Sequence, residues 1–265
     1  MTTASVAFFR RDFLIWSSYR TSVVSFVFGA GVMIAIVYFL GQVVTADSGT
    51  LDKYGGDYVA YLLAGFALTD IFNRGLSSLP GTIREQQQNG TLEPLLVTPL
   101  RLSEFVIGSA LFGAIVSGAR AGVMLGFGVV VLGFWHNADV VSILIVLIPG
   151  AVAVFALSIL FAAVVVLIKQ ADPIVSAYSL MAAILGGMFF PVEALPTWMQ
   201  PLAWLIPLSH ALSGIRLGLQ GESPAGVLPH AVALVVLSAL LLPVSILAFN
   251  WALSRARQDG TLVQY

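Results

Sequence analysis

Long runs of apolar residues separated by short polar stretches extend over most of the chain. A helix rises about 1.5 Å per residue and the hydrocarbon core of a membrane is about 30 Å thick, so about 20 apolar residues are needed to cross it. Because backbone groups find no water partners in lipid, such runs are predicted to be helices. The six candidate segments are Val23–Val44, Tyr58–Leu79, Phe105–Phe134, Val140–Ile168, Ile174–Phe190 and Val227–Leu253. The pattern predicts an all-α membrane protein with six transmembrane helices.

Composition supports an integral membrane protein, because 58% of the residues are hydrophobic and only 9% are charged. Soluble proteins carry about 25% charged residues, so lipid is expected to cover much of this surface. The uncharged run 21–46 is too long for the 7–15 residue core of a cleaved signal peptide, which predicts a retained first helix. The 12 basic residues are scattered and form no basic stripe, so no nucleic-acid partner is expected.

Basic residues are distributed unequally between the two sides of the six-span arrangement. The loops on the side of the N-terminus carry Arg10, Arg11, Arg20, Arg84, Arg101, Lys169, Arg255 and Arg257. The opposite loops carry only Lys53 and Arg216. Since cytoplasmic loops are enriched in Lys and Arg, both termini are predicted to lie in the cytoplasm, with the chain in a bacterial cytoplasmic (inner) membrane.

The residues before the first predicted span combine aromatic side chains with arginines. Phe8, Phe9, Phe13 and Trp16 fall near one helical face. This mixture is typical of a helix that lies in the membrane interface. The alternative is a plain helical extension of the first span.

The stretch between the fifth and sixth predicted spans, 192–225, is too apolar for a simple external loop. It carries the apolar residues Leu195, Trp198, Met199, Leu202, Trp204, Leu205 and Ile206, interrupted by Pro196, Pro201 and Pro207. Tryptophan is favoured at the membrane interface. Short re-entrant or interfacial helices on the outer face are predicted, with a tight external linker as the alternative.

The third predicted span has a stripe of small residues, Gly118, Gly122 and Gly126. Small residues at four-residue spacing let helices approach closely in lipid. Packing within one subunit is the preferred interpretation, and an interface between subunits is the alternative.

Arg120 lies near the middle of the same span, where a charge is costly and often functional. It is a candidate for contact with an anionic group of a cargo. Alternatively, Arg120 pairs with Asp70 or extends toward the interface. Asp70 and Arg74 stand at i and i+4, a spacing that favours a local ion pair.

The polar segment 83–99 joins the second and third predicted spans on the predicted cytoplasmic side. Residues 83–89 read as a short helix that ends at Gly90, because glycine readily adopts the left-handed conformation of a C-terminal residue. Thr91 is placed to cap a second short helix, which ends at Thr98-Pro99. Leucines 92, 95 and 96 give it an apolar side, so a docking element for a partner protein is one interpretation. A plain interfacial connector is the other.

The chain lacks the sequence signatures of an ATPase or a metalloenzyme. Its two lysines, Lys53 and Lys169, do not follow a glycine, so no Walker A loop exists. His136, His210 and His230 are far apart in the sequence and form no zinc pair. No catalytic residue and no cofactor or metal site in this chain is therefore predicted.

Two segments resemble the type-2 ABC transporter permease family, which includes daunorubicin-type drug exporters, nodulation-factor exporters and polysaccharide exporters. The first contains Glu85, Gly90-Thr91-Leu92-Glu93, Leu95-Leu96 and Thr98-Pro99. The second contains Phe189-Phe190-Pro191, Leu195-Pro196, Trp198-Met199, Pro207-Leu208, Ala211-Leu212 and Arg216. The resemblance covers nearly the whole chain, including the order of the six spans.

The resemblance implies that residues 1–265 form a single permease domain without a nucleotide-binding domain. It implies a dimer, of two copies or of two related chains, that works with two separate ATPase subunits, which bind ATP and magnesium. It also implies a cytoplasmic coupling helix. The residues expected to contact the ATPase are Glu85, Asn89, Gly90, Thr91, Leu92, Glu93, Leu95, Leu96, Thr98 and Pro99. The residues expected near the pathway are Arg120, Phe189 and Phe190.

An exporter of drug-like, amphipathic, lipid or glycolipid molecules is therefore the leading hypothesis, and antibiotic resistance is among its expected roles. A polysaccharide exporter is the alternative within the family, although the coupling loop of polysaccharide exporters usually has a different sequence. Outside the family the rivals are a secondary transporter or channel that works alone, and a membrane-embedded enzyme. A secondary transporter is expected to show ion-coupling groups near the midplane.

Overall fold

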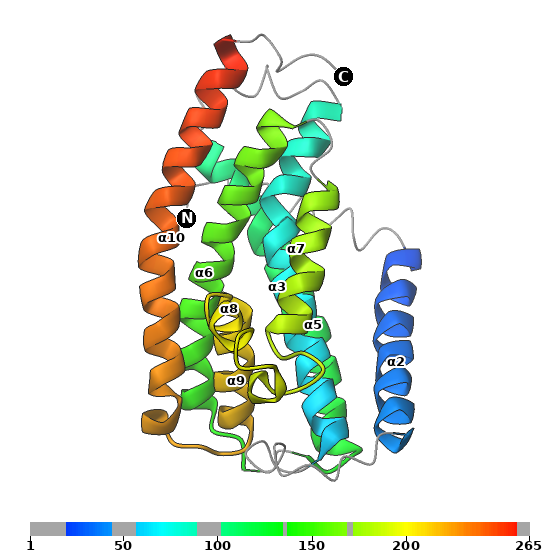
Figure 1. Ribbon diagram of the computed structural model, residues 1–265. Coiled ribbons are helices and arrows are strands. Elements are labelled where there is room, and N and C mark those ends of the chain that lie inside the picture. The colour runs from blue at the N-terminus through cyan, green and yellow to red at the C-terminus, as the bar shows by residue number, and fades with distance from the viewer. Residues whose placement is uncertain (1–19, 44–56, 89–101, 135–136, 169–171, 259–265) are drawn as a thin grey trace.

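The apolar stretches of the chain form long helices that run side by side in the computed structural model (Figure 1). The structure describes residues 20–43, 57–88, 102–134, 137–168 and 172–258. Within these ranges the chain forms eight α-helices and one 3-10 turn, and no strand. The all-helical prediction is confirmed for this part of the chain. The predicted interfacial helix before residue 20 and the predicted helix after Gly90 lie outside it.

The five longest helices are α2 (Arg20–Val43), α3 (Tyr58–Gln88), α5 (Leu102–Val130), α6 (Val140–Leu167) and α10 (Pro224–Gln258). Each overlaps one of the predicted spans, although α3 runs nine residues further than predicted and α5 stops four residues earlier. Two described stretches, α6 and residues 224–256 of α10, are both long and apolar enough to cross a membrane. Shorter apolar stretches occupy residues 28–40, 116–130 and 172–185. The six crossings therefore remain a prediction.

Helix α6 begins at Asp139, whose side chain accepts hydrogen bonds from the backbone N–H groups of Val141 and Ser142. This is the usual way in which an aspartate satisfies the free donors of a first turn. The Ser142 hydroxyl donates a further bond to the same carboxylate, and this bond is the main reason why the pKa of Asp139 is lowered. The neighbouring helix α10 packs along α6.

Helix α3 differs from the prediction, because it continues nine residues past Leu79 to Gln88 as one helix. The sequence predicts a span that ends at Leu79 and a short helix over residues 83–89, and this division is wrong, because one helix runs through both. Hydroxyl groups support the helix around the proline: Ser78 donates to the Gly75 carbonyl at 2.7 Å and Thr82 donates to the Ser78 carbonyl at 2.8 Å. The polarity of a segment determines whether water or lipid surrounds it. A change in polarity does not by itself end a helix.

Helix α7 (Asp172–Leu185) is shorter than predicted, because the chain leaves the helix at Gly186 and Gly187 instead of at Phe190. Gly187 has a φ of 88°, in the left-handed region that glycine adopts without strain. The 14 residues of α7 rise about 21 Å, which is less than the thickness of the hydrocarbon core.

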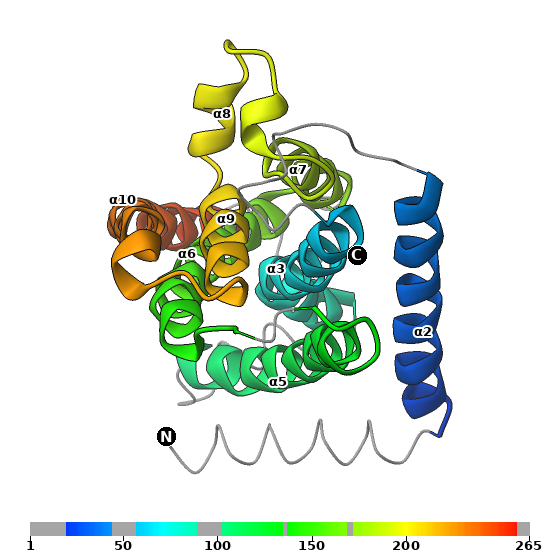
Figure 2. The same ribbon diagram turned by 90° about the horizontal axis from the view of Figure 1, so that it is seen from below.

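The stretch after α7 folds into three short elements: a 3-10 turn η2 (Val192–Ala194), α8 (Gln200–Trp204) and α9 (Pro207–Leu219). Figure 2 shows α8 at the periphery, while α9 lies among α3, α6, α7 and α10. Trp198 and Trp204 are 69% and 57% exposed, whereas most of α9 is buried. This division agrees with a segment that is partly interfacial and partly inserted into the bundle; its position relative to a membrane is a prediction.

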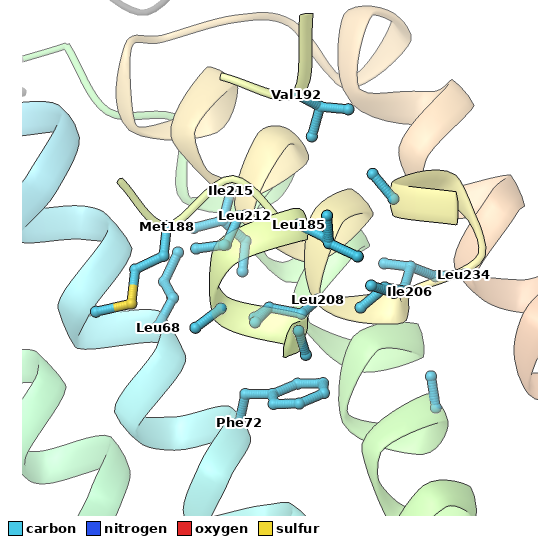
Figure 3. Close-up of a cluster of buried hydrophobic side chains, with 14 of the residues drawn as sticks. Leu68, Phe72, Leu185, Met188, Val192, Ile206, Leu208, Leu212, Ile215 and Leu234 are labelled. Atoms are coloured by element: carbon cyan, nitrogen blue, oxygen red, sulfur yellow. The ribbon is translucent and has the colours of Figure 1, made fainter. Parts of the chain in front are cut away.

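The main hydrophobic core gathers around α9 (Figure 3). Leu208, Leu212 and Ile215 of α9 meet side chains from α3, α7 and α10. A second cluster joins α2, α3 and α5 through residues such as Val37 and Leu63. The core therefore fixes α9 as a central element.

The glycine stripe of α5 has no packing partner among the described residues. A Cβ atom added at Gly118, Gly122 or Gly126 would have no atom of a described neighbouring residue within 4 Å. The predicted close packing of these glycines within one subunit is therefore not found in this part of the chain.

Candidate functional site

A buried arginine, Arg216, joins three separate segments at one end of the helix bundle. Its guanidinium donates from Nη1 to the Gly187 carbonyl at 2.7 Å, and from Nη2 to the carbonyls of Tyr61 at 3.1 Å and Met188 at 3.2 Å. Its Cζ atom lies 3.5 Å from the centre of the Tyr61 ring, a cation–π distance. The Tyr61 hydroxyl also donates to the Gly187 carbonyl, at 2.7 Å. We call Arg216, Tyr61, Gly187 and Met188 the arginine clamp.

Two glycines make the arginine clamp possible. A Cβ atom on Gly65 of α3 would lie 2.5 Å from both Arg216 Nη2 and the Met188 carbonyl oxygen, a distance that no side chain tolerates. The positive φ of Gly187 turns the chain so that the carbonyls of 187 and 188 both face the arginine. The clamp therefore depends on backbone positions in α3 and in the turn after α7, which are far apart in the sequence.

Sequence reasoning placed Arg216 among the charges of an external loop and missed this role. The structure places it in α9, where its exposed fraction is 3%. One signal was available: Arg216 stands alone within an apolar stretch that includes Leu212, Ile215 and Leu217. An arginine in such surroundings is expected to bond buried acceptors, since burying a guanidinium group without acceptors is costly.

A second polar cluster joins α3 and α5 near the middle of both helices. Asp70 accepts a hydrogen bond from Arg74 Nε at 3.0 Å, which confirms the expected i, i+4 pair. Arg120 Nη1 lies 3.9 Å from the other oxygen of the same carboxylate. Two guanidinium groups and one carboxylate leave this cluster with a net charge of +1.

Arg120 also faces α2. Its Nη2 atom would lie 2.8 Å from a Cβ atom added at Gly29, so the absence of a side chain at that position leaves room for the guanidinium. Its Nε atom is buried and has no hydrogen-bond partner among the described residues. The geometry shows the pairing that the sequence offered as one alternative, and it leaves donor capacity for another anion.

An apolar cavity of about 180 Å³ lies between α3, α5, α6 and α9. Leu68, Phe72, Val154 and Leu208 are among its lining residues, and Ser117 of α5 adds a hydroxyl. Small-molecule sites commonly enclose about 300–1,000 Å³. The cavity is therefore suited to an apolar part of a molecule rather than to a whole cargo.

The predicted pathway residues Phe189 and Phe190 follow α7 and are half-buried. Phe189 packs edge-on against Phe66 of α3, with ring centres 5.8 Å apart. Both phenylalanines come directly after the clamp residues Gly187 and Met188, so the clamp positions them. The structure gives no contact that joins Arg120 to either phenylalanine.

Glu85 is the one predicted coupling residue that the structure describes, and it is exposed on the last turns of α3. The other nine are Asn89, Gly90, Thr91, Leu92, Glu93, Leu95, Leu96, Thr98 and Pro99, which lie outside the described residues. Arg84, beside Glu85, forms an ion pair with Asp172 at the start of α7. The end of α3 that leads into the predicted coupling segment is thus tied to α7.

Comparison with known proteins gives a consistent result over most of the chain. Residues 4–219 match the model of the ABC-2 type transporter family. The chain is 27% identical over 239 residues to Nodulation protein J of Sinorhizobium fredii, covering 89% of this chain and 88% of that protein. It is 26% identical over 253 residues to Nodulation protein J of Bradyrhizobium diazoefficiens, covering 94% of each.

A shorter match relates the chain to the "Probable multidrug ABC transporter permease YbhR" of Escherichia coli. The two are 26% identical over 129 residues, which is 49% of this chain and 35% of that protein. The long match to the family model includes both segments on which the resemblance rested. This chain belongs to the ABC-2 type transporter family of membrane proteins.

Proposed function

We propose that the chain is the permease subunit of an ATP-driven exporter and that separate ATPase subunits supply the energy. Membership of the ABC-2 type transporter family over residues 4–219 is the observation that carries this proposal. The absence of a Walker A loop from the sequence supports it, because ATP and magnesium then have to be bound by a partner. Two permease chains, identical or related, form the pathway between them.

The coupling segment 83–99 is proposed to receive the ATPase. Its first residues belong to α3, and Arg84 ties them to Asp172 of α7. A push on the segment would therefore act on two helices together. The glutamates at 85 and 93 offer charges to basic groups of the ATPase, and the leucines at 92, 95 and 96 offer an apolar anchor.

An amphipathic cargo, such as a drug-like, lipid or glycolipid molecule, fits the available surfaces best. The apolar cavity can hold a hydrocarbon part, and the net positive cluster around Arg120 can attract an anionic group. The name of one relative, a probable multidrug ABC transporter permease, agrees with a drug-like cargo. A polysaccharide is the alternative cargo.

Reconstitution tests this function. Vesicles that contain the permease and the ATPase encoded beside it are expected to move a fluorescent amphipathic dye only when ATP is hydrolysed. A secondary transporter or channel would move the dye without the ATPase, and that result would contradict the proposal.

The charges of the Arg120 cluster predict different effects on stability for substitutions at Arg120 and at Asp70. Arg120→Ala is expected to leave the amount of folded protein nearly unchanged, because Asp70 keeps Arg74 as its partner at 3.0 Å. Asp70→Asn is expected to destabilise by about 1 kcal/mol, because two guanidinium groups then face each other without a carboxylate. Thermal unfolding in detergent measures both variants.

The same variants separate the structural role of Arg120 from a role in transport. We expect Arg120→Ala to reduce transport of an anionic dye about tenfold while transport of a neutral dye persists. If Arg120→Ala unfolds more readily than Asp70→Asn, or slows both dyes equally, contact with an anionic cargo is excluded.

The proposed topology places residues 82–100 in the cytoplasm and residues 192–224 outside. The chain has no cysteine, so single cysteines can be introduced without background. Leu205→Cys, at a position that is 67% exposed, is expected to react with a membrane-impermeant maleimide on intact cells. Gln88→Cys is expected to react only after permeabilisation. Labelling of residue 88 on intact cells would mean that the proposed orientation is wrong.

A further inference from the structure

We propose that Arg216 is a positioning residue that fixes α9 to α3, so that movement of α3 at its coupling end is passed to the segment 186–219. This inference rests on the proposed function, because it assumes that an ATPase moves the coupling segment. The arginine clamp would then be the joint at which this movement reaches the part of the protein that carries Phe189 and Phe190.

The hydrogen bonds of Arg216 are directional, and they connect α9 to two other segments. One planar guanidinium bonds carbonyls on two sides: Tyr61 of α3, and Gly187 and Met188 after α7. Its five donors are held in a fixed fork, and the Tyr61 ring covers one face. Displacement of α3 relative to α9 would disrupt the bond to the Tyr61 carbonyl together with the contact to the Tyr61 ring.

The contacts of α9 with α6 and α10 are of a different kind. Gly214 and Gly218 of α9 pack closely against side chains such as Val146 and Ile143 of α6. One backbone hydrogen bond joins the start of α6 to α9, from the Asp139 N–H to the Gly218 carbonyl at 2.9 Å. The contact of α9 with α3, in contrast, includes a charged side chain that bonds a backbone carbonyl of α3.

Helix α3 is a suitable lever, because it is one continuous helix of 31 residues from the clamp to the coupling segment. It spans about 46 Å at 1.5 Å per residue. Tyr61 lies in its first turn and Gln88 is its last residue, directly before the segment that is proposed to contact the ATPase. A movement of the coupling end is thus connected to α9 through one continuous helix.

Distance measurements between spin labels test this connection in the permease–ATPase complex in lipid nanodiscs. One pair, Leu205→Cys and Val140→Cys, reports the segment 186–219 against α6 from the turn between α8 and α9, and both positions are exposed. A second pair, Ser77→Cys and Leu240→Cys, reports α3 against α10. Trapping with ADP and vanadate is expected to shift both distances by about 2 Å or more in the parent protein.

Arg216→Met should abolish the shift of the first pair and leave that of the second pair intact. If Arg216 had a purely structural role, Arg216→Met would lower the amount of complex, and the distance shifts of the two label pairs would remain alike. Arg216→Lys keeps the charge without the planar fork, so the first shift should fall to about half or less. Where Arg216→Met fails to assemble, Arg216→Lys makes the test by itself. Tyr61→Phe removes the hydroxyl that bonds Gly187 and no bond of Arg216, so it tests the remaining part of the clamp.

Tyr178→Phe is the matched control, because it removes the hydroxyl of a tyrosine that packs on Phe161 away from the clamp. It should shift both distances as the parent does. Equal shifts of the first pair in the parent and in the clamp variants would overturn the role of Arg216, even while the proposed function stands. If neither pair shifts in the parent, α3 is not driven by the ATPase, and the proposed function fails together with this inference.

Discussion

Leu95→Asp is expected to release the ATPase from the complex. Leu95 belongs to the apolar side of the predicted coupling helix, and anchors of this kind carry most of the energy of an interface. Truncating the best of them costs about 2 kcal/mol or more, which corresponds to about a 30-fold weaker affinity. A buried carboxylate adds a desolvation cost. The measurement is the amount of ATPase that co-purifies with the tagged permease.

The control for Leu95→Asp is the same substitution at Leu205, a leucine that is 67% exposed and distant in sequence from the coupling segment. Leu205→Asp should retain the ATPase. Glu93→Ala is expected to weaken ATP-driven transport while some assembly remains, and Gly90→Val should fail to couple, because a β-branched residue resists the turn predicted there. If all three coupling variants behave like the parent, segment 83–99 is not the contact with the ATPase.

Gly65→Leu is expected to be the most damaging substitution in the described part of α3. Its Cβ atom would lie 2.5 Å from Arg216 Nη2 and from a backbone carbonyl oxygen, and the backbone cannot yield as a flexible side chain would. Overpacking of this kind costs about 3 kcal/mol, and the arginine would also lose acceptors. The expected result is a large fall in folded protein in the membrane and a lower Tm in detergent.

Gly81→Leu provides a control in the same helix. Gly81 is exposed, and no described atom lies within 4 Å of a Cβ added there. Since leucine is a better helix former than glycine, Gly81→Leu should be neutral or slightly stabilising. Equal losses at the two positions would show that α3 tolerates no larger residue in general, and that the arginine clamp is not the cause.

Apolar length predicted the long helices well, because the cost of leaving backbone groups unbonded in lipid depends mainly on composition. The ends of the helices were predicted less well. Polarity does not end a helix, so α3 continues through Pro80 to Gln88. In contrast, α7 ends early, at Leu185, and the chain then turns at Gly187 to bring carbonyls to Arg216.

The contacts between segments that are distant in the sequence could not be predicted from the sequence. Asp70 and Arg74 are four residues apart, so their ion pair followed from helix geometry alone. The arginine clamp joins residues 61, 187, 188 and 216, whose proximity depends on how α3, α7 and α9 pack. Charge counting treated Arg216 as a loop residue, because the count uses sequence position and has no information about burial.

Native mass spectrometry tests most directly whether a separate ATPase drives this chain. The complex is purified through a tag on the permease, after co-expression with its candidate ATPase, and its intact mass is measured. We expect a mass equal to two permease chains of 28.1 kDa plus two ATPase subunits, with ATP hydrolysis in the same fraction. A permease that is isolated without any ATPase, and that transports after reconstitution alone, would mean that no separate ATPase drives the chain.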